Sequence, residues 1–355
     1  MKKIVVLGGG LVGSTIARDL SGINRVIVLD QHISPRLASF PVSAIAMDCS
    51  YNFGEYIKDA DLVINALPGF LGYQALKQII AARKNVVDIS FFAEDPFSLQ
   101  QDAMAAGITA VVDCGVAPGL CNMMLGYVLD ELDTIQSYEC VVGGLPVKRV
   151  MPFQYKAPYS PADVIEFYTR PARIRVGGQN RVVPALSDIA LENTEVGTLE
   201  SFNTDGLRTL LTTMPPHAVR NMRERTYRWP GTAQFINQLR DAGFFVPEFL
   251  PFTTQILKKA WQLEPREEEF TLMNVTIKSD EANMRFTVFD QFDGLDSSMA
   301  RTTGFTCNAI ANLILDGTLN HLGIVAPEQI PECFMDVCGY LEERKVSIEL
   351  TYPSN

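Results

Sequence analysis

The chain begins with Met1-Lys2-Lys3-Ile4-Val5-Val6-Leu7, followed directly by Gly8-Gly9-Gly10-Leu11-Val12-Gly13. The helix-like segment Ser14–Leu20 comes next, so an apolar strand, the pattern G-x-G-x-x-G and a helix follow in order. In this order Gly8 permits a tight turn, Gly10 lets the backbone approach a pyrophosphate, and Gly13 lets helix and strand pack closely. The segment therefore predicts a dinucleotide-binding turn. We expect the pyrophosphate at the helix N-terminus, with Leu11 and Val12 beside it.

Asp30 ends the second apolar run, Arg25–Leu29. It lies roughly twenty residues beyond the glycines, where a carboxylate accepts hydrogen bonds from the adenosine ribose hydroxyls. A carboxylate there repels a 2′-phosphate, and the next residues are Gln31 and His32 rather than an arginine. We therefore predict NAD as cofactor, with NADP left open by the nearby Arg36. The alternative is that Asp30 is only a turn carboxylate after a strand.

The composition indicates an ordinary globular chain. Its 355 residues are 47% hydrophobic and 20% charged, with a formal net charge of −11, which suggests two domains. Lys and Arg form no basic stripe, and no apolar stretch reaches the roughly 18 residues of a membrane span. We therefore expect neither nucleic acid nor membrane as a partner. Because the N-terminus is itself the first predicted strand, we expect no signal peptide and a cytoplasmic location.

The seven cysteines are scattered, and no C-x-x-C pair occurs. The three histidines, His32, His217 and His321, are far apart in the sequence. This pattern fits reduced core thiols and predicts no metal site. Acid–base chemistry should therefore fall to other side chains.

Strand and helix signals alternate through the first third of the chain. Strands are predicted at Ala44–Asp48, Asp61–Gly69, Asn85–Ser90 and Ile108–Asp113, with helices at Tyr73–Arg83 and Leu99–Ala106. This alternation predicts a parallel, doubly wound sheet that binds its ligand outside the carboxyl ends of the strands. The residues at those ends are then the candidates for the site: Asp30, Asp48, Ala66, Leu67, Pro68, Asp88, Ser90 and Asp113.

The pattern changes after Gly119. A helix is predicted at Leu120–Leu132, a hairpin at Phe270–Ile277 and Met284–Phe289, and a further helix at Phe305–Leu315. We therefore predict an α/β protein with an N-terminal Rossmann domain, residues 1–120, completed by returning helices at about 305–345. The inserted residues 121–304 are predicted to form an α+β domain with a mixed sheet, which binds substrate and mediates oligomerisation.

Ordered motifs along nearly the whole chain resemble the saccharopine dehydrogenase-like family. They are Val87–Phe91, Asp113–Leu120, Gly143–Pro146, Tyr168–Ala172, Thr204–Leu210, Arg228–Gly231 and Ser298–Gly304. The resemblance is strongest to the branch that oxidises the side-chain amine of lysine with NAD. It implies that Arg228 holds a substrate carboxylate, with Thr204 and Gly144 near the substrate.

Three positions depart from the saccharopine-forming members of the family. Those members carry Asp where this chain has Ala117, tyrosine where it has Phe91, and cysteine where it has Val142. The departures favour the amine-oxidising branch. Arg228 could instead stack on Trp229 or Tyr227 and stabilise only the fold. Thr204 could lie in a turn before a helix at Leu207–Leu211, and Arg301–Gly304 could cap the returning helix.

Hydride transfer from a primary amine requires the neutral amine, and free lysine amines have a pKa of about 10.4, so a base is needed. We favour Asp113 as this base, because it borders the Pro118-Gly119 turn that leads into the second domain, and place Asp88 second. Either carboxylate could instead be a turn or cap residue. Cys114 could donate a proton or only pack in the core.

The predicted reaction is NAD-dependent oxidative deamination of the L-lysine side-chain amine to 2-aminoadipate 6-semialdehyde, which cyclises to piperideine-6-carboxylate. The alternatives are a saccharopine-, opine- or carboxynorspermidine-type dehydrogenase, or a non-catalytic NAD-sensing binding protein. The resemblance also implies a homodimer or higher homo-oligomer formed through the second domain. The apolar segment Phe244–Pro247 would be buried at that interface or in the core.

Overall fold

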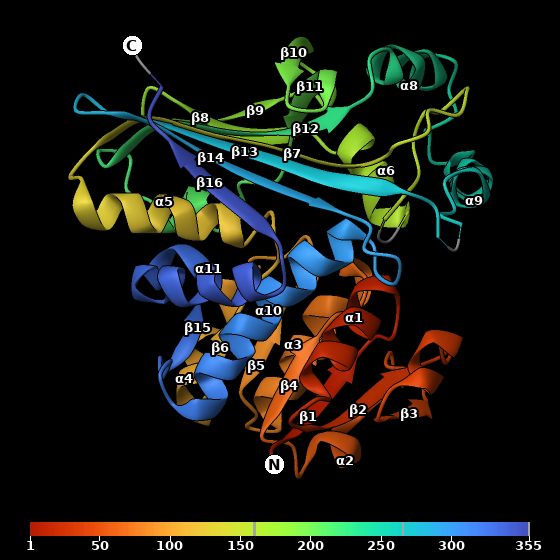
Figure 1. Ribbon diagram of the computed structural model, residues 1–355, viewed down its shortest axis with the longest axis vertical. Helices are drawn as coiled ribbons and strands as arrows, with labels where there is room; N and C mark the ends of the chain where they lie inside the picture. The colour runs from red at the N-terminus through yellow and green to blue at the C-terminus, as the bar shows by residue number, and fades with distance from the viewer. Residues whose placement is uncertain (159–160, 265, 354–355) are drawn as a thin grey trace. The chain divides into compact units, whose positions relative to one another are not determined.

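The computed structural model describes residues 1–158, 161–264 and 266–353 (Figure 1). The chain divides into two compact units. Unit 1 comprises Met1–Tyr127 and Ala300–Lys345, and unit 2 comprises Val128–Met299 and Val346–Asn355. Each unit has its own sheet and its own core.

Unit 1 contains a seven-stranded, wholly parallel sheet in the order β15-β6-β5-β4-β1-β2-β3. Its strands are β1 (Lys3–Leu7), β2 (Arg25–Asp30), β3 (Val42–Ala46), β4 (Leu62–Asn65), β5 (Val86–Asp88), β6 (Thr109–Val111) and β15 (Gly323–Val325). Its helices are α1 (Leu11–Leu20), α2 (Gly54–Ile57), α3 (Gly69–Ala81), α4 (Gln100–Ala106) and α11 (Phe334–Glu343). The strand order reverses between β1 and β4, and ligands bind at such a point in doubly wound sheets.

Unit 2 contains a nine-stranded mixed sheet. The main path is β10 (Ala190–Thr194), β11 (Gly197–Thr204), β12 (Val219–Arg228), β7 (Ile135–Pro146), β13 (Glu269–Lys278), β14 (Asn283–Gln291) and β16 (Ser347–Thr351). The short strands β8 (Ala172–Val176) and β9 (Gln179–Val183) extend from β12. Among the described strand pairs of unit 2, β7 and β12 run parallel and the others run antiparallel. Its helices are α6 (Pro161–Thr169), α7 (Leu210–Thr213), α8 (Thr232–Asp241) and α9 (Leu250–Ala260).

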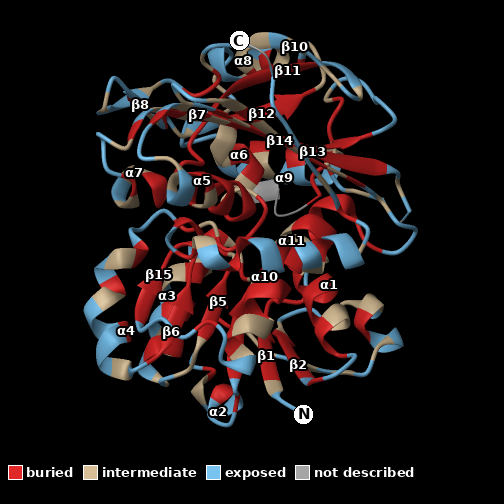
Figure 2. Cartoon of the chain, turned by 60° about the vertical axis from the view of Figure 1, so that its left-hand side comes forward, coloured by how far each residue is buried: buried red, intermediate tan, exposed pale blue. Residues whose placement is uncertain are grey.

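Two helices carry the chain between the units, α5 (Leu120–Glu131) and α10 (Ser298–Asp316). The predicted fold class, a Rossmann sheet plus an inserted α+β domain with a mixed sheet, is confirmed. Figure 2 shows buried residues along the central strands of both sheets. The central strands of unit 1 are apolar throughout, as expected for a parallel sheet covered on both faces.

Several boundaries differ from the sequence prediction. α10 begins at Ser298 rather than Phe305, so Arg301–Gly304 lie inside the helix and do not cap it. The third strand ends at Ala46, which leaves Asp48 in the following turn. Along the chain, the boundaries between the units fall at Tyr127/Val128 and Met299/Ala300, compared with the predicted 120/121 and 304/305. The C-terminal segment, with β16, belongs to unit 2. Polar helix starts and short strands carry weak local signals, which explains these shifts.

Among the helices of the described residues, none combines the length and apolarity needed to cross a membrane.

Candidate functional site

The glycine turn of unit 1 contains one open and two crowded positions. Gly8 has φ +95°, and a Cβ there would lie 2.5 Å from the carbonyl oxygen of Ala66. A Cβ on Gly13 would lie 2.0 Å from the carbonyl oxygen of Gly8, whereas one on Gly10 would meet no atom within 4 Å. Gly8 and Gly13 therefore allow β1, β4 and α1 to pack. Gly10, the N-cap of α1, leaves space for a ligand at the helix N-terminus.

Asp30 holds this turn in place. Its Oδ2 accepts a hydrogen bond from the Gly9 N–H at 2.6 Å, and its Oδ1 accepts one from the His32 N–H at 2.8 Å. The carboxylate is half-buried at the end of β2, and the His32 contact is the one expected of a turn carboxylate. Contact with a ribose stays a prediction. Together with the open position at Gly10, these residues fit a dinucleotide.

Asp48 is occupied by a local turn. Its Oδ1 accepts hydrogen bonds from the N–H and the hydroxyl of Ser50, at 2.9 and 2.6 Å. These bonds hold the pKa of Asp48 below its ordinary value. The Asp48 carboxylate thus already has a local role in the turn, and its predicted contact with the cofactor stays a prediction.

Asp88 is the centre of a buried network at the ends of β4 and β5. Its Oδ2 accepts a hydrogen bond from Asn65 Nδ2 at 2.7 Å, and its Oδ1 accepts one from the Ser90 N–H at 2.7 Å. Asn65 also donates to the carbonyl of Gly72 at 3.0 Å. Burial raises the pKa of Asp88 to about 7, and the charge of Asp113 adds to the rise. Sequence reasoning named Asp88 and Ser90 but missed Asn65, although Asn65 directly precedes Ala66.

The remaining strand-end residues lie in the same unit. Ala66 donates its N–H to the carbonyl of Leu7 at 2.9 Å, and Pro68 occupies the N-cap position of α3, with the buried Leu67 between them. Asp113 is buried two residues beyond β6 and has φ +52°. Cys114 is fully buried, and burial and the charge of Asp113 raise its thiol pKa. This environment supports the core-packing alternative for Cys114.

Arg228 is the last residue of β12 in unit 2 and is 2% exposed. Its Nε donates to the Tyr168 hydroxyl at 2.8 Å, and its Nη1 donates to the Tyr227 carbonyl at 2.8 Å. The guanidinium carbon lies 4.2 Å from the centroid of the Tyr155 ring. The structure thus places Tyr155 over the guanidinium, whereas the predicted stacking partners were Trp229 and Tyr227.

Thr204 ends strand β11 rather than lying in a turn, and the helix after it spans Leu210–Thr213. It is 1% exposed, and its hydroxyl lies 2.9 Å from that of Thr226 on the neighbouring strand. The turn prediction is wrong because strand pairing extends to this residue. Gly144 lies within β7, where a Cβ would meet Met299 and Pro158 at 2.9 Å. Both residues serve packing, and substrate contact stays a prediction.

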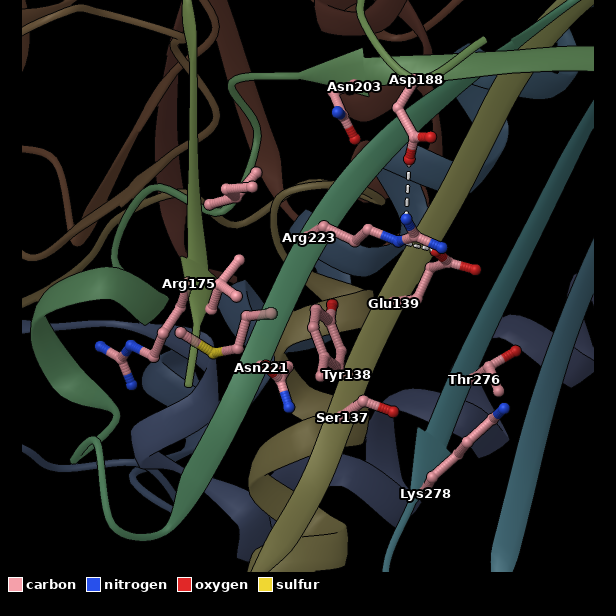
Figure 3. A pocket seen from close by; sticks show the side chains of 13 residues that line it. Ser137, Tyr138, Glu139, Arg175, Asp188, Asn203, Asn221, Arg223, Thr276 and Lys278 are labelled. Atoms are coloured by element: carbon pink, nitrogen blue, oxygen red, sulfur yellow. Dashed lines mark hydrogen bonds and ion pairs between the residues drawn. The ribbon is translucent and has the colours of Figure 1, made fainter. Parts of the chain in front are cut away.

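A pocket of about 320 Å³ lies over β7, β8, β12 and β13 of unit 2 (Figure 3). Arg223 crosses it and pairs with Glu139 and with Asp188. Arg228, Thr204 and Gly144 are not among the lining residues. This pocket is a polar groove braced by ion pairs and is separate from the candidate residues of unit 2.

A glycine turn at the switch point of a parallel sheet, with buried carboxyls at the neighbouring strand ends, is typical of a dinucleotide-binding domain. Residues 4–111 match the saccharopine dehydrogenase NADP binding domain, and residues 115–346 match the saccharopine dehydrogenase C-terminal domain. The chain belongs to the saccharopine dehydrogenase family. Its N-terminal unit thus corresponds to the nucleotide-binding domain of this family.

The chain is also similar to individual proteins with related names. The chain is 31% identical over 192 residues to the mitochondrial alpha-aminoadipic semialdehyde synthase of Mus musculus, covering 50% of this chain and 21% of that protein. It is 25% identical over 312 residues to a saccharopine dehydrogenase [NADP(+), L-glutamate-forming] of Pyricularia oryzae, covering 79% of this chain and 65% of that protein. The structure of apo saccharopine dehydrogenase (L-Glu forming) from Saccharomyces cerevisiae matches with a TM-score of 0.80 at 19% identity, covering 100% of both chains. The matched part of the chain thus spans about a fifth of the length of the mouse relative. The chain shares the fold of the yeast structure.

Proposed function

We propose that the chain is a lysine 6-dehydrogenase, which oxidises the side-chain amine of L-lysine to 2-aminoadipate 6-semialdehyde with NAD. The observation that carries the proposal is the carboxyl pair Asp88 and Asp113 in the nucleotide-binding unit, at the end of β5 and two residues beyond β6. Bound nicotinamide supplies the hydride acceptor. The protein has to bind the amino acid and remove one proton from its ammonium group.

Asp113 is the proton acceptor in this proposal. Both Asp88 oxygens already accept hydrogen bonds from Asn65 and Ser90, so Asp88 is less accessible than Asp113 to a proton from the substrate in this proposal. After proton loss the amine releases hydride from its carbon, and the resulting iminium is hydrolysed by water to the aldehyde and ammonium. The Asp88 pKa of about 7, raised by burial and by the charge of Asp113, lets Asp88 exchange a proton near neutral pH.

Arg228 is the proposed partner of the substrate α-carboxylate. A guanidinium offers two parallel N–H groups to a carboxylate, and the contacts with Tyr155 and Tyr168 support a fixed plane for such a pair.

A saccharopine-forming reaction is the second candidate, because several relatives carry that name. Ala117, Phe91 and Val142 stand where the saccharopine-forming members carry Asp, tyrosine and cysteine, and these apolar side chains cannot replace the polar groups. Opine- and carboxynorspermidine-type substrates are the remaining catalytic alternatives. A non-catalytic NAD sensor would not need the carboxyl pair.

NAD is the proposed nucleotide. The Asp30 carboxylate at the end of β2 is half-buried beside the glycine turn, and its charge would repel a 2′-phosphate. The family domain that matches is described as NADP binding, so the two nucleotides have to be compared directly.

The test is a spectrophotometric assay of nucleotide reduction, run with NAD and with NADP over L-lysine, saccharopine, an opine and carboxynorspermidine. We expect NAD reduction with L-lysine. Reduction only with saccharopine, or only with NADP, would contradict the proposal. Absence of reduction with every amine would favour the sensor.

We also propose self-association through unit 2. Phe244 and Val246 of the apolar segment are 43% and 38% exposed, and such side chains favour burial against a partner. Light scattering should give a dimer or larger species, and Phe244→Ser should shift it towards the monomer. A monomeric wild-type chain would contradict the proposal.

A further inference from the structure

The motif Tyr168–Ala172 begins with a residue that contacts Arg228, the proposed partner of the substrate carboxylate. Tyr168 lies near the end of α6 and is fully buried. Its hydroxyl oxygen accepts the Arg228 Nε–H at 2.8 Å. Burial raises the pKa of Tyr168, so the hydroxyl is neutral and keeps its own proton.

The Tyr168 ring is itself held by aromatic neighbours. Its centroid lies 5.9 Å from that of Trp261 at the end of α9, and 6.0 Å from that of Phe202 in β11. These are ordinary distances for edge and tilted aromatic pairs. Two other segments of unit 2, α9 and β11, thus contribute to holding the Tyr168 ring.

Three contacts on different sides fix the plane of the Arg228 guanidinium. Tyr155 covers one face at 4.2 Å, the Tyr168 hydroxyl takes Nε–H, and the Tyr227 carbonyl takes one Nη1–H. The Tyr168 bond is made by a side-chain oxygen, which a substitution to Phe removes. A free arginine side chain carries large rotational entropy, so such a bond favours one orientation.

The residue paired with Arg228 across the strands, Glu200, uses its carboxylate to bind backbone N–H groups. Glu200 in β11 is the cross-strand partner of Arg228. Its two oxygens accept the backbone N–H groups of Gly231 and Ala233 at the start of α8. Glu200 therefore anchors the turn that follows Arg228, and its charge stabilises the N-terminus of that helix.

We propose that Tyr168 is a positioning residue, which orients Arg228 for bidentate capture of a substrate carboxylate and so sets the preference for amino acids over simple amines. This inference rests on the proposed function. It assigns selectivity to a hydroxyl that acts through the Arg228 Nε–H rather than through the substrate.

The test compares Tyr168→Phe with Tyr227→Phe. Both remove one buried tyrosine hydroxyl, but Tyr227 donates to Glu192 on the opposite face of β12. The substrates are L-lysine and 1,5-diaminopentane, which is lysine without its carboxylate. We expect Tyr168→Phe to lower kcat/KM for L-lysine roughly tenfold and to leave that for 1,5-diaminopentane and the KM for nucleotide unchanged. Tyr227→Phe should leave the ratio of the two substrates at the wild-type value.

A second measurement does not depend on turnover. In protein labelled with ¹⁵N-arginine, the Arg228 Nε–H signal, assigned with Arg228→Lys, should exchange with water faster in Tyr168→Phe than in wild type. Equal exchange, or a proportional loss of activity on both substrates, would overturn the inference. A wild-type enzyme that oxidises neither amine would overturn the proposed function, and the exchange measurement would then decide the positioning role alone.

Discussion

In unit 1 the candidate residues lie at the ends of parallel strands, whereas in unit 2 Arg228 lies among side chains from several separate segments. Asp30 and Asp88 end strands of one sheet, and Asp113 lies two residues beyond a third strand of that sheet. Around Arg228, by contrast, Tyr155 comes from a connection and Tyr168 from α6. A parallel sheet brings its strand ends together by construction, while an antiparallel mixed sheet gathers residues only through its particular register.

Gly13→Ala tests the packing of unit 1 most severely. The added Cβ would lie 2.0 Å from the Gly8 carbonyl oxygen, so α1 and β1 have to separate. We expect a loss of about 3 kcal/mol or more in the free energy of unfolding, measured by denaturant titration. Gly10→Ala is the control, because a Cβ there meets nothing within 4 Å. It should keep wild-type stability and weaken nucleotide binding, and equal destabilisation by both variants would contradict this assignment.

Each unit also contains a buried carboxyl whose pKa is raised to about 7 by burial, Asp88 in unit 1 and Glu269 in unit 2. The folded state binds these protons more tightly than the unfolded chain, so stability should fall as pH rises from about 4 to about 7, by up to about 1.4 kcal/mol per pH unit for each group. Asp88→Asn should reduce this slope in unit 1 and Glu269→Gln in unit 2. Hydrogen exchange read separately for peptides of each unit measures both. Unchanged slopes in both variants would show that other groups cause the pH dependence.

Asp113→Asn tests the proposed base. We expect kcat with L-lysine to fall about a hundredfold near neutral pH, and less in alkaline solution, where the substrate amine is already neutral. The pH–rate profile measures this difference. Asp102→Asn, at an exposed position in α4, is the control and should resemble wild type. An unchanged profile for Asp113→Asn would move the role to Asp88 or to water.

Arg228→Ala tests the carboxylate partner in unit 2. The KM for L-lysine should rise about 30-fold or more, because a charge-assisted pair is lost, while the affinity for nucleotide is retained. Arg223→Ala removes a guanidinium of the same strand that pairs with Glu139 and Asp188, and should leave KM unchanged. If KM for L-lysine stays constant in Arg228→Ala, Arg228 only stabilises the fold.

Asp30→Ala should have the smallest effect. Removing the charge should improve the use of NADP relative to NAD about tenfold, which corresponds to about 1.4 kcal/mol. Asp30→Asn removes the same charge but keeps one acceptor for the glycine turn, and should shift the preference with less loss of stability. Steady-state constants for both nucleotides provide the measurement. A wild-type enzyme that already prefers NADP would contradict the role of Asp30.

The candidate residues of unit 1 could be named from the sequence because each follows an apolar run. The Asn65–Asp88 bond could not, since its two residues end different strands and meet only when β4 and β5 pair in register. Thr204 was misplaced for a related reason. The polar stretch Asn203–Gly206 is typical of a turn, but pairing with β12 extends β11 through Thr204.

The sequence by itself determined the order of strands and helices in unit 1, the glycine turn and the carboxyls that follow its strands, because these depend on local periodicity and chain order. Only the tertiary structure decided which aromatic ring covers Arg228, which hydroxyl accepts its Nε–H and where the Glu200 charge is directed. Those contacts join residues that are distant along the chain, and strand register with side-chain packing sets them.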